Sequence, residues 1–140
     1  MPIRTRSQDT TSENQIASLM ETRWDCTVHR TGYLDAWDYI GIKDGRTVFI
    51  AELKTRNNPS TQYPTVYLSA HKWITLLQGA LGLGVTPLFI VRFTDTVMYK
   101  RITEIDARKS TMAGRFDRTD APNDVELMIL VPVSEMRVLA

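Results

Sequence analysis

An acid and an amine two positions apart, Glu52 and Lys54, are the residues of this chain best placed to do chemistry. They follow an apolar run, residues 47–51, that is typical of a β-strand. Successive side chains of a strand point to opposite faces, so Glu52 and Lys54 share one face. A carboxylate is a hard oxygen ligand suited to Mg²⁺ or Mn²⁺, which can also bind phosphate oxygens of a substrate. Taken alone, the pair is a weak signal, because an acid and a base at this spacing are common on solvated strand faces.

Asp38 is a candidate partner for Glu52, and the hairpin between the two residues decides whether they meet. A shift of one residue in strand pairing sends every side chain to the opposite face. A two-residue turn at Asp44-Gly45 would place Trp37 opposite Glu52. In that register Asp35, rather than Asp38, would share the Glu52 face.

A three-residue loop at Lys43-Asp44-Gly45 gives the other register, in which the glycine forms a positive-φ bulge. Asp38 then pairs with Ile50 and becomes the diagonal neighbour of Glu52, ~7–8 Å away at the backbone. Two carboxylates can close that separation around a metal ion. We favour this register, and the loop length is its test, because a two-residue turn would favour Asp35.

The elements that must hold these residues follow from periodicity and capping signals. The pattern predicts an α/β fold, a central mixed sheet with helices on both faces, in the order α-β-β-β-α-β with additional C-terminal strands. A length of 140 residues indicates a single domain, residues 1–140, with residues 1–10 expected to be flexible. The expected elements are a helix from Thr11-Ser12 to about Trp24, strands near 26–28, 39–42 and 47–54, an extended segment over 65–68, a helix capped by Ser69 and stopped by Gly79, Gly82 and Gly84, and strands over 87–93, 97–102 and 125–131.

Composition limits the classes of function. The net charge is +1 and the pI is about 7.9, so any affinity for nucleic acid must come from a local patch. The lone Cys26 cannot form an internal disulfide, which fits a reducing cytoplasm. No apolar stretch approaches the ~18 residues of a membrane span, and nothing resembles a secretion signal.

Residues 37–42, Trp-Asp-Tyr-Ile-Gly-Ile, followed by a hairpin and by residues 49–56, Phe-Ile-Ala-Glu-Leu-Lys-Thr-Arg, resemble the signature of PD-(D/E)xK nucleases. Within that superfamily the chain is similar to archaeal Holliday-junction resolvases and VRR-type nucleases, over roughly residues 13–93. The resemblance implies a restriction-endonuclease-like core and a DNA endonuclease dependent on Mg²⁺ or Mn²⁺, with Holliday junctions or other branched DNA as candidate substrates. The alternative is a catalytically inactive DNA-binding or regulatory protein on the same fold.

The resemblance also implies roles for individual residues. Asp38 and Glu52 would hold the metal together with the main-chain carbonyl of Leu53, and Lys54 would orient or activate the attacking water. Glu13, on the first helix, would support a metal through water. Two adjacent carboxylates repel when both are ionised, which raises at least one pKa unless a cation is present.

Two departures from the family pattern concern the residues around this site. Ala36-Trp37 stands where a proline usually precedes the aspartate, and Ser69-Ala70-His71-Lys72 stands where many relatives place a glutamine. Either Lys72 substitutes for that glutamine, or this chain lacks its role.

DNA is the expected partner, and a homodimer is expected if the protein makes paired nicks as a resolvase does. Arg56, next to the motif, is the best candidate for a phosphate contact, with Lys72 and His71 as further candidates. For His71 a solvated helix face is the simpler reading.

Overall fold

A six-stranded mixed sheet forms the centre of the fold, in the order β1-β2-β3-β5-β6-β9. Strands β3 and β5 run parallel, and every other neighbouring pair in this sheet is antiparallel. The computed structural model describes residues 6–31, 37–113 and 125–140. The strands of the central sheet are Thr27–Arg30 (β1), Tyr39–Lys43 (β2), Arg46–Thr55 (β3), Thr86–Arg92 (β5), Val97–Arg101 (β6) and Arg137–Val138 (β9).

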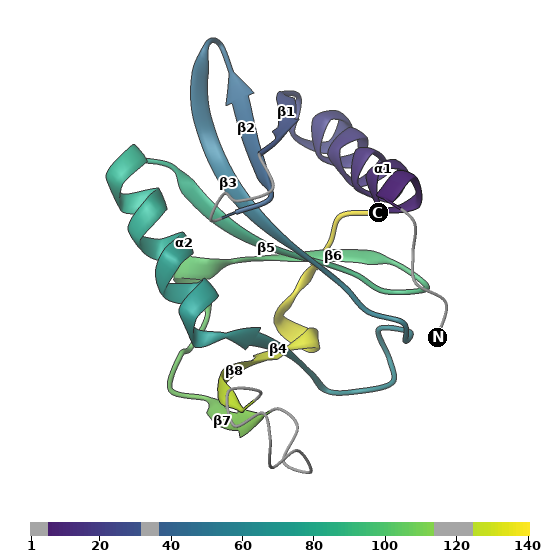
Figure 1. The fold of residues 1–140 in the computed structure, drawn as a ribbon, viewed down its shortest axis with the longest axis vertical. Coiled ribbons are helices and arrows are strands. Elements are labelled where there is room, and N and C mark those ends of the chain that lie inside the picture. The colour runs from purple at the N-terminus through teal and green to yellow at the C-terminus, as the bar shows by residue number, and fades with distance from the viewer. Residues whose placement is uncertain (1–5, 32–36, 114–124) are drawn as a thin grey trace.

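Two helices cover opposite faces of this sheet (Figure 1). Helix α1, Arg6–Trp24, buries Ile16 and Met20 in a cluster with residues from β2, β3, β5 and β6. Helix α2, Ala70–Leu83, buries Leu76 and Ala80 on the other side, against Ile50 and neighbouring side chains. The expected α/β fold with helices on both faces is confirmed. Neither helix within the described ranges combines the length and apolar character needed to span a bilayer.

The start of α1 differs from the prediction. The helix begins at Arg6, whereas the capping signal at Thr11-Ser12 predicts a start several residues later. Residues 6–10 contain no proline or glycine, so the helix can continue N-terminal to the residues that form its apolar face. Residues 1–5 lie outside the described part of the chain.

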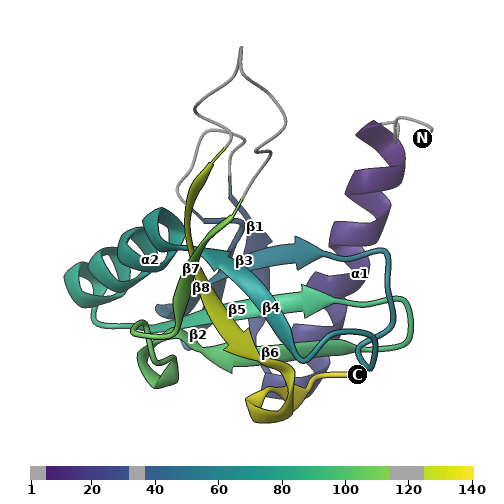
Figure 2. The same cartoon turned by 90° about the horizontal axis from the view of Figure 1, so that it is seen from below.

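A second, three-stranded sheet was not predicted. It has the order β4-β8-β7 and is antiparallel, and it runs obliquely to the central sheet (Figure 2). Its buried side chains, among them Val66 and Ile129, join the cluster beneath α2. The pairing of β4 with β8 joins segments far apart in sequence, which local periodicity cannot reveal, and no strand was predicted where β7 lies. The strands are Thr65–Ser69 (β4), Ser110–Ala113 (β7) and Glu126–Pro132 (β8), and short 3₁₀ turns occupy Ile102–Glu104 and Val133–Glu135.

The β2–β3 hairpin has a two-residue turn, so the predicted three-residue loop is wrong. Lys43 pairs with Arg46, and Asp44 and Gly45 both have positive φ, 53° and 74°. Mirror-image turns of this kind match the right-handed twist of paired strands, and glycine allows positive φ without steric cost.

A bulge further along the same hairpin shifts the register by one residue. Ile42 pairs with Thr47, but Gly41 pairs with Phe49, which leaves Val48 as the extra residue. The Phe49 ring lies over Gly41, where an added Cβ would come within 2.0 Å of a ring carbon. This close approach requires glycine on the strand opposite the bulge.

The bulge decides which aspartate joins Glu52. Because of it, Tyr39 pairs with Ala51, and these two side chains lie in the cluster on the α1 side. The residues one step further out, Asp38 and Glu52, therefore belong to the α2 side of the sheet. The turn alone would have favoured Asp35, which lies outside the described residues.

Trp37, next to Asp38, packs against Gly79 of α2. A Cβ on Gly79 would lie 2.5 Å from the Trp37 ring and 3.2 Å from Ile50. Gly79 and Gly82 lie inside α2, contrary to their predicted role as helix stops, and the helix ends before Gly84 with a left-handed φ of 69°. Gly79 is therefore a packing residue.

Gly79→Ala is expected to lower the free energy of unfolding by about 1–3 kcal/mol, because the added methyl group overpacks the Trp37 contact. Gly82→Ala is the matched control in the same helix, where a Cβ would meet nothing within 4 Å. Alanine there should stabilise the protein by about 0.5–1 kcal/mol. Urea unfolding of both variants measures the difference, and equal effects of the two substitutions would contradict the contact.

Candidate active site

The backbone around Asp38 is fixed to β3 and to the end of β1 by hydrogen bonds. The Asp38 N–H donates to the carbonyl of Ala51 at 2.9 Å, and its own carbonyl accepts from the Thr31 N–H at 2.9 Å. The Thr31 hydroxyl donates to the carbonyl of Trp37. The Asp38 Oδ2 accepts the main-chain N–H of Leu53 at 2.7 Å. One carboxylate oxygen is thus held against the strand that carries Glu52.

Glu52 lies in the middle of β3 with its side chain only 12% exposed. Its Oε1 lies 3.0 Å from the Nζ of Lys72, while its Oε2 is buried and accepts no hydrogen bond from the residues that the structure describes. Burial raises the pKa of the Glu52 carboxyl above its usual range, the neighbouring Asp38 raises it further, and Lys72 opposes both effects. The site therefore contains two neighbouring carboxylates, one of which is buried with an oxygen that has no partner among the described residues.

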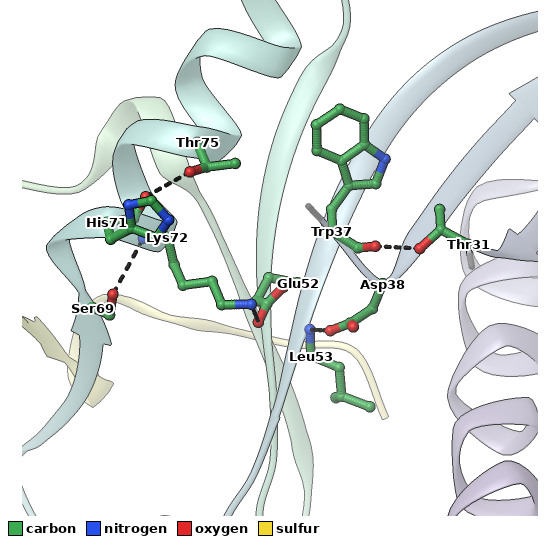
Figure 3. Close-up of polar contacts among 9 residues, drawn as sticks. All are labelled: Thr31, Trp37, Asp38, Glu52, Leu53, Ser69, His71, Lys72 and Thr75. Carbon is green, nitrogen blue, oxygen red and sulfur yellow. Dashed lines mark hydrogen bonds and ion pairs between the residues drawn. The ribbon is translucent and has the colours of Figure 1, made fainter. Parts of the chain in front are cut away.

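Lys72 reaches Glu52 from the first turn of α2 (Figure 3). The cap that begins this helix is Ser69, whose hydroxyl oxygen accepts the Lys72 N–H at 3.2 Å. The side chain of Lys72 is 45% exposed, so its ammonium can leave Glu52 for solvent or a ligand. His71 is exposed on the same turn, and its main-chain carbonyl accepts a hydrogen bond from Thr75 Oγ1.

Lys54 lies two residues beyond Glu52 on the same face of β3. Burial lowers the pKa of its amine, the nearby Arg56 lowers it further, and Glu126 and Glu52 act in the opposite direction. Within the described ranges no carboxylate lies at ion-pair distance from Lys54. The amine is therefore available to a water molecule or a phosphate.

Arg56 follows the end of β3, where its N–H donates to the carbonyl of Arg92 at 2.9 Å. Burial lowers the pKa of its guanidinium. Arg56 thus extends the row of candidate site residues that begins with Glu52 and Lys54.

Glu13 is not brought to the carboxylate pair. It lies on α1, which covers the other face of the sheet, and its carboxylate forms an ion pair with Arg30. Its main-chain carbonyl accepts the Tyr39 hydroxyl at 2.9 Å. In the parts of the chain that are described, no group of three or more acidic, histidine or cysteine side chains is arranged to hold a metal ion.

The donor atoms that are present nevertheless fit a small divalent cation. Mg²⁺ commonly takes one or two carboxylates and completes its shell with water and substrate phosphate oxygens. Asp38 and Glu52 supply two carboxylates, and the buried, unpaired Oε2 of Glu52 lacks the cation or donor that its burial requires.

Sequence reasoning missed two contacts that shape the site. Thr31, which hydrogen bonds to the carbonyls of both Trp37 and Asp38, carries no signal beyond its place before a glycine. The ion pair of Lys72 with Glu52 was also not predicted, although Lys72 itself was singled out. Lys72 lies in the first turn of a capped helix that faces the motif strand, and this position is the signal that could have predicted the ion pair.

Comparisons with known proteins bear on the family and the fold of the chain. The chain matches the family model described as "Phage putative PDDEXK endonuclease" over residues 3–139. A comparison with curated proteins gives no match. Among solved structures it is similar to Hjc, a Holliday junction resolvase from the archaeal hyperthermophile Archaeoglobus fulgidus, with a TM-score of 0.57 and 15% sequence identity over 90% of this chain and 85% of that chain.

The structural likeness, at this low identity, shows the restriction-endonuclease-like fold. The family match covers nearly the whole chain and includes the Asp38, Glu52 and Lys54 motif. The resemblance read from the sequence is confirmed, and the chain belongs to this phage PD-(D/E)xK endonuclease family.

Proposed function

We propose that this protein is a DNA endonuclease that hydrolyses phosphodiester bonds with Mg²⁺ or Mn²⁺ at Asp38, Glu52 and Lys54. The observation that carries the proposal is the contact region of Asp38 and Glu52, in which a buried carboxylate oxygen has no partner among the described residues. A structural pair of acids would be expected to have its buried oxygens satisfied. Family membership makes the phosphodiester the reacting group.

The proposed roles combine the positions of these residues with the family resemblance. Asp38 and Glu52 would hold the metal, with the main-chain carbonyl of Leu53 as a third ligand. A divalent metal at such a site supplies Lewis-acid stabilisation of the phosphate and lowers the pKa of a bound water. Lys54, half-buried on the same strand face, holds the attacking water beside the phosphate. Its lowered pKa favours proton exchange with that water.

Three further side chains are proposed to act on the DNA. The partly exposed Lys72 side chain could swing its ammonium away from Glu52 and bind a phosphate oxygen, which would leave the Glu52 carboxylate to hold a metal. Arg56, which follows β3, and the exposed His71, next to Lys72 in α2, would contact phosphates of the DNA backbone. Glu13 would reach a metal only through water, and that role requires release of its carboxylate from Arg30.

The proposed activity is tested by incubating the full chain with supercoiled plasmid and with a panel of linear, flap, single-stranded and four-way-junction DNA. We expect cleavage with Mg²⁺ or Mn²⁺ and none with EDTA. Tight DNA binding without cleavage under any of these conditions would overturn the enzyme proposal in favour of a catalytically inactive DNA-binding protein.

A preference for branched DNA and a homodimeric state belong to the same proposal. The support is the shared fold with a Holliday junction resolvase, since two coordinated nicks require two active sites. Light scattering of the free protein measures its mass, and the substrate panel ranks the DNA structures. A monomer that cuts linear duplex as fast as four-way junctions would contradict both.

Lys72→Met is expected to increase the affinity of the site for Mn²⁺ by about 5- to 10-fold, because the ammonium on Glu52 competes with the metal. Titration calorimetry at pH 8 measures this affinity without reference to cleavage. Lys109→Met removes the same charge from an exposed position and should leave the affinity unchanged. Weaker Mn²⁺ binding in Lys72→Met would show that Lys72 supports the site rather than competing for it.

A further inference from the structure

A pocket of about 400 Å³ opens where β3 ends, next to the candidate active site. Its walls come from Arg56 after β3, from Phe93 after β5, and from residues 63–67, which run into the first half of β4. Tyr63, before β4, and Tyr67, within β4, line the pocket and remain 57% and 39% exposed. The pocket therefore combines exposed aromatic rings with a guanidinium.

The wall containing Tyr63 is held in place by hydrogen bonds. The N–H and hydroxyl of Ser60 donate to the two carboxylate oxygens of Asp95, at 2.9 and 2.8 Å. The carbonyl of Pro64 accepts the N–H of Val133 at 2.9 Å. Both ends of the wall are tied to other elements, so the pocket exists before any ligand binds.

The chemistry of the lining identifies a class of ligand. Arg56 forms no ion pair with the residues that the structure describes. Its guanidinium is also partly buried, which lowers its pKa. A planar guanidinium stacks on aromatic ligands and binds phosphate oxygens in a bidentate manner. Tyrosine rings stack on nucleobases of any sequence. A flat ring joined to a phosphate, which is a nucleotide, satisfies both groups, and the volume lies in the range of small-molecule sites.

The position of the pocket relates that nucleotide to the cleavage site. Arg56 follows Glu52 by four residues on the same chain segment, which corresponds to ~13 Å at 3.3 Å per residue. One strand of duplex DNA advances 3.4 Å per nucleotide along the helix axis. A DNA strand whose phosphate lies at Glu52 and Lys54 would therefore pass the pocket within a few nucleotides.

We propose that this pocket, bounded by Arg56, Tyr63 and Tyr67, takes an unpaired base of the substrate strand a few nucleotides from the scissile phosphate. The inference rests on the proposed nuclease function and names a determinant of its substrate preference. A base of an intact duplex must be unpaired and unstacked before it can enter the pocket, which costs free energy. The cost is smaller for a base that is already unpaired. The pocket thus favours DNA that is branched, frayed or single-stranded near the cut.

The test is an abasic scan by fluorescence anisotropy, with the full chain in Ca²⁺ and a labelled forked DNA carrying one abasic site at a time. For the unsubstituted protein, we expect one position of the unpaired arm at which loss of the base weakens binding by about 5- to 150-fold. Tyr67→Ala should weaken binding of the intact fork by a similar factor and should show no further loss at that position. Tyr67→Phe retains the ring and is the matched control.

Three outcomes separate the inference from the proposed function. A flat abasic profile, or a Tyr67→Ala effect equal on forked and fully paired DNA, overturns the pocket while leaving any observed cleavage intact. A base-dependent profile that Tyr67→Ala removes, in a protein that cleaves no DNA, supports the pocket and overturns the nuclease. Absence of any DNA binding overturns both.

Discussion

Glu52→Gln is expected to reduce DNA cleavage by at least roughly 100-fold and to stabilise the metal-free protein at neutral pH. The amide keeps the shape of the side chain but removes a ligand charge that a divalent cation requires. It also removes the repulsion between Glu52 and Asp38 and the cost of burying a carboxylate with an unpaired oxygen. The gain should be about 1 kcal/mol, or roughly 4 °C in Tm for a domain of this size.

The pH dependence of this gain follows from the raised pKa of Glu52. The folded protein keeps the Glu52 proton to a higher pH than the unfolded chain does, so the stability of the unsubstituted protein falls as pH rises between the two pKa values. The difference from Glu52→Gln should be small below the unfolded pKa of about 4.3 and should grow through the interval up to the folded pKa. Thermal unfolding in EDTA from pH 4 to pH 8 measures it.

Glu135→Gln is the matched control, because Glu135 is exposed and should change neither cleavage nor Tm. Added Mn²⁺ should raise the Tm of the unsubstituted protein and leave that of Glu52→Gln almost unchanged. A Glu52→Gln variant that is less stable at pH 7 would indicate that the ion pair with Lys72 outweighs the repulsion from Asp38. Cleavage at the original rate would place the metal elsewhere.

The fold was predictable wherever a segment carries its own signal. The apolar run of β5 and the alternation around β3 are typical of strands, and the serine cap of α2 marks the start of a helix. The second sheet was not predictable in this way, because β8 pairs with β4 across about sixty residues, and its nearer partner, β7, lies in a polar stretch with no strand pattern. Non-local pairing of this kind depends on the packed arrangement of the whole chain.

The site was predictable from strand parity for Glu52 and Lys54, and only in part for Asp38. The argument for Asp38 rested on a three-residue loop, yet the structure has a two-residue turn and brings Asp38 to the same face through a bulge at Val48. Relative to a two-residue turn without a bulge, the predicted loop and the observed bulge each shift the strand pairing by one residue, in opposite directions. The two registers therefore differ by two residues and place Asp38 on the same face of the sheet. The bulge is accompanied by the contact between Gly41 and the Phe49 ring, which is visible only once the strands are paired.

Lys54→Met is expected to reduce cleavage by roughly 10²–10⁴-fold, the range typical of removing a group that transfers or orients a proton. Methionine preserves the length and packing of the side chain, so the affinity for DNA should change by only about 3-fold, as for loss of a single surface charge. Lys43→Met, at the exposed tip of the hairpin, should cleave as the unsubstituted protein does. Single-turnover cleavage and anisotropy binding on the same DNA separate the two effects.

The stability of Lys54→Met provides a second readout, with a pH slope opposite to that of Glu52→Gln. Burial lowers the pKa of Lys54, so the folded protein releases this proton at a lower pH than the unfolded chain. The cost of burying the ammonium is fully present below the folded pKa and disappears as pH rises toward the unfolded value of about 10.4. Lys54→Met should therefore stabilise the protein at pH 7, and this advantage should shrink toward pH 10. If Lys54→Met cleaves DNA at the original rate, the water-positioning role belongs to Lys72. If Lys54→Met is less stable at pH 7, Lys54 is paired rather than free in the folded protein.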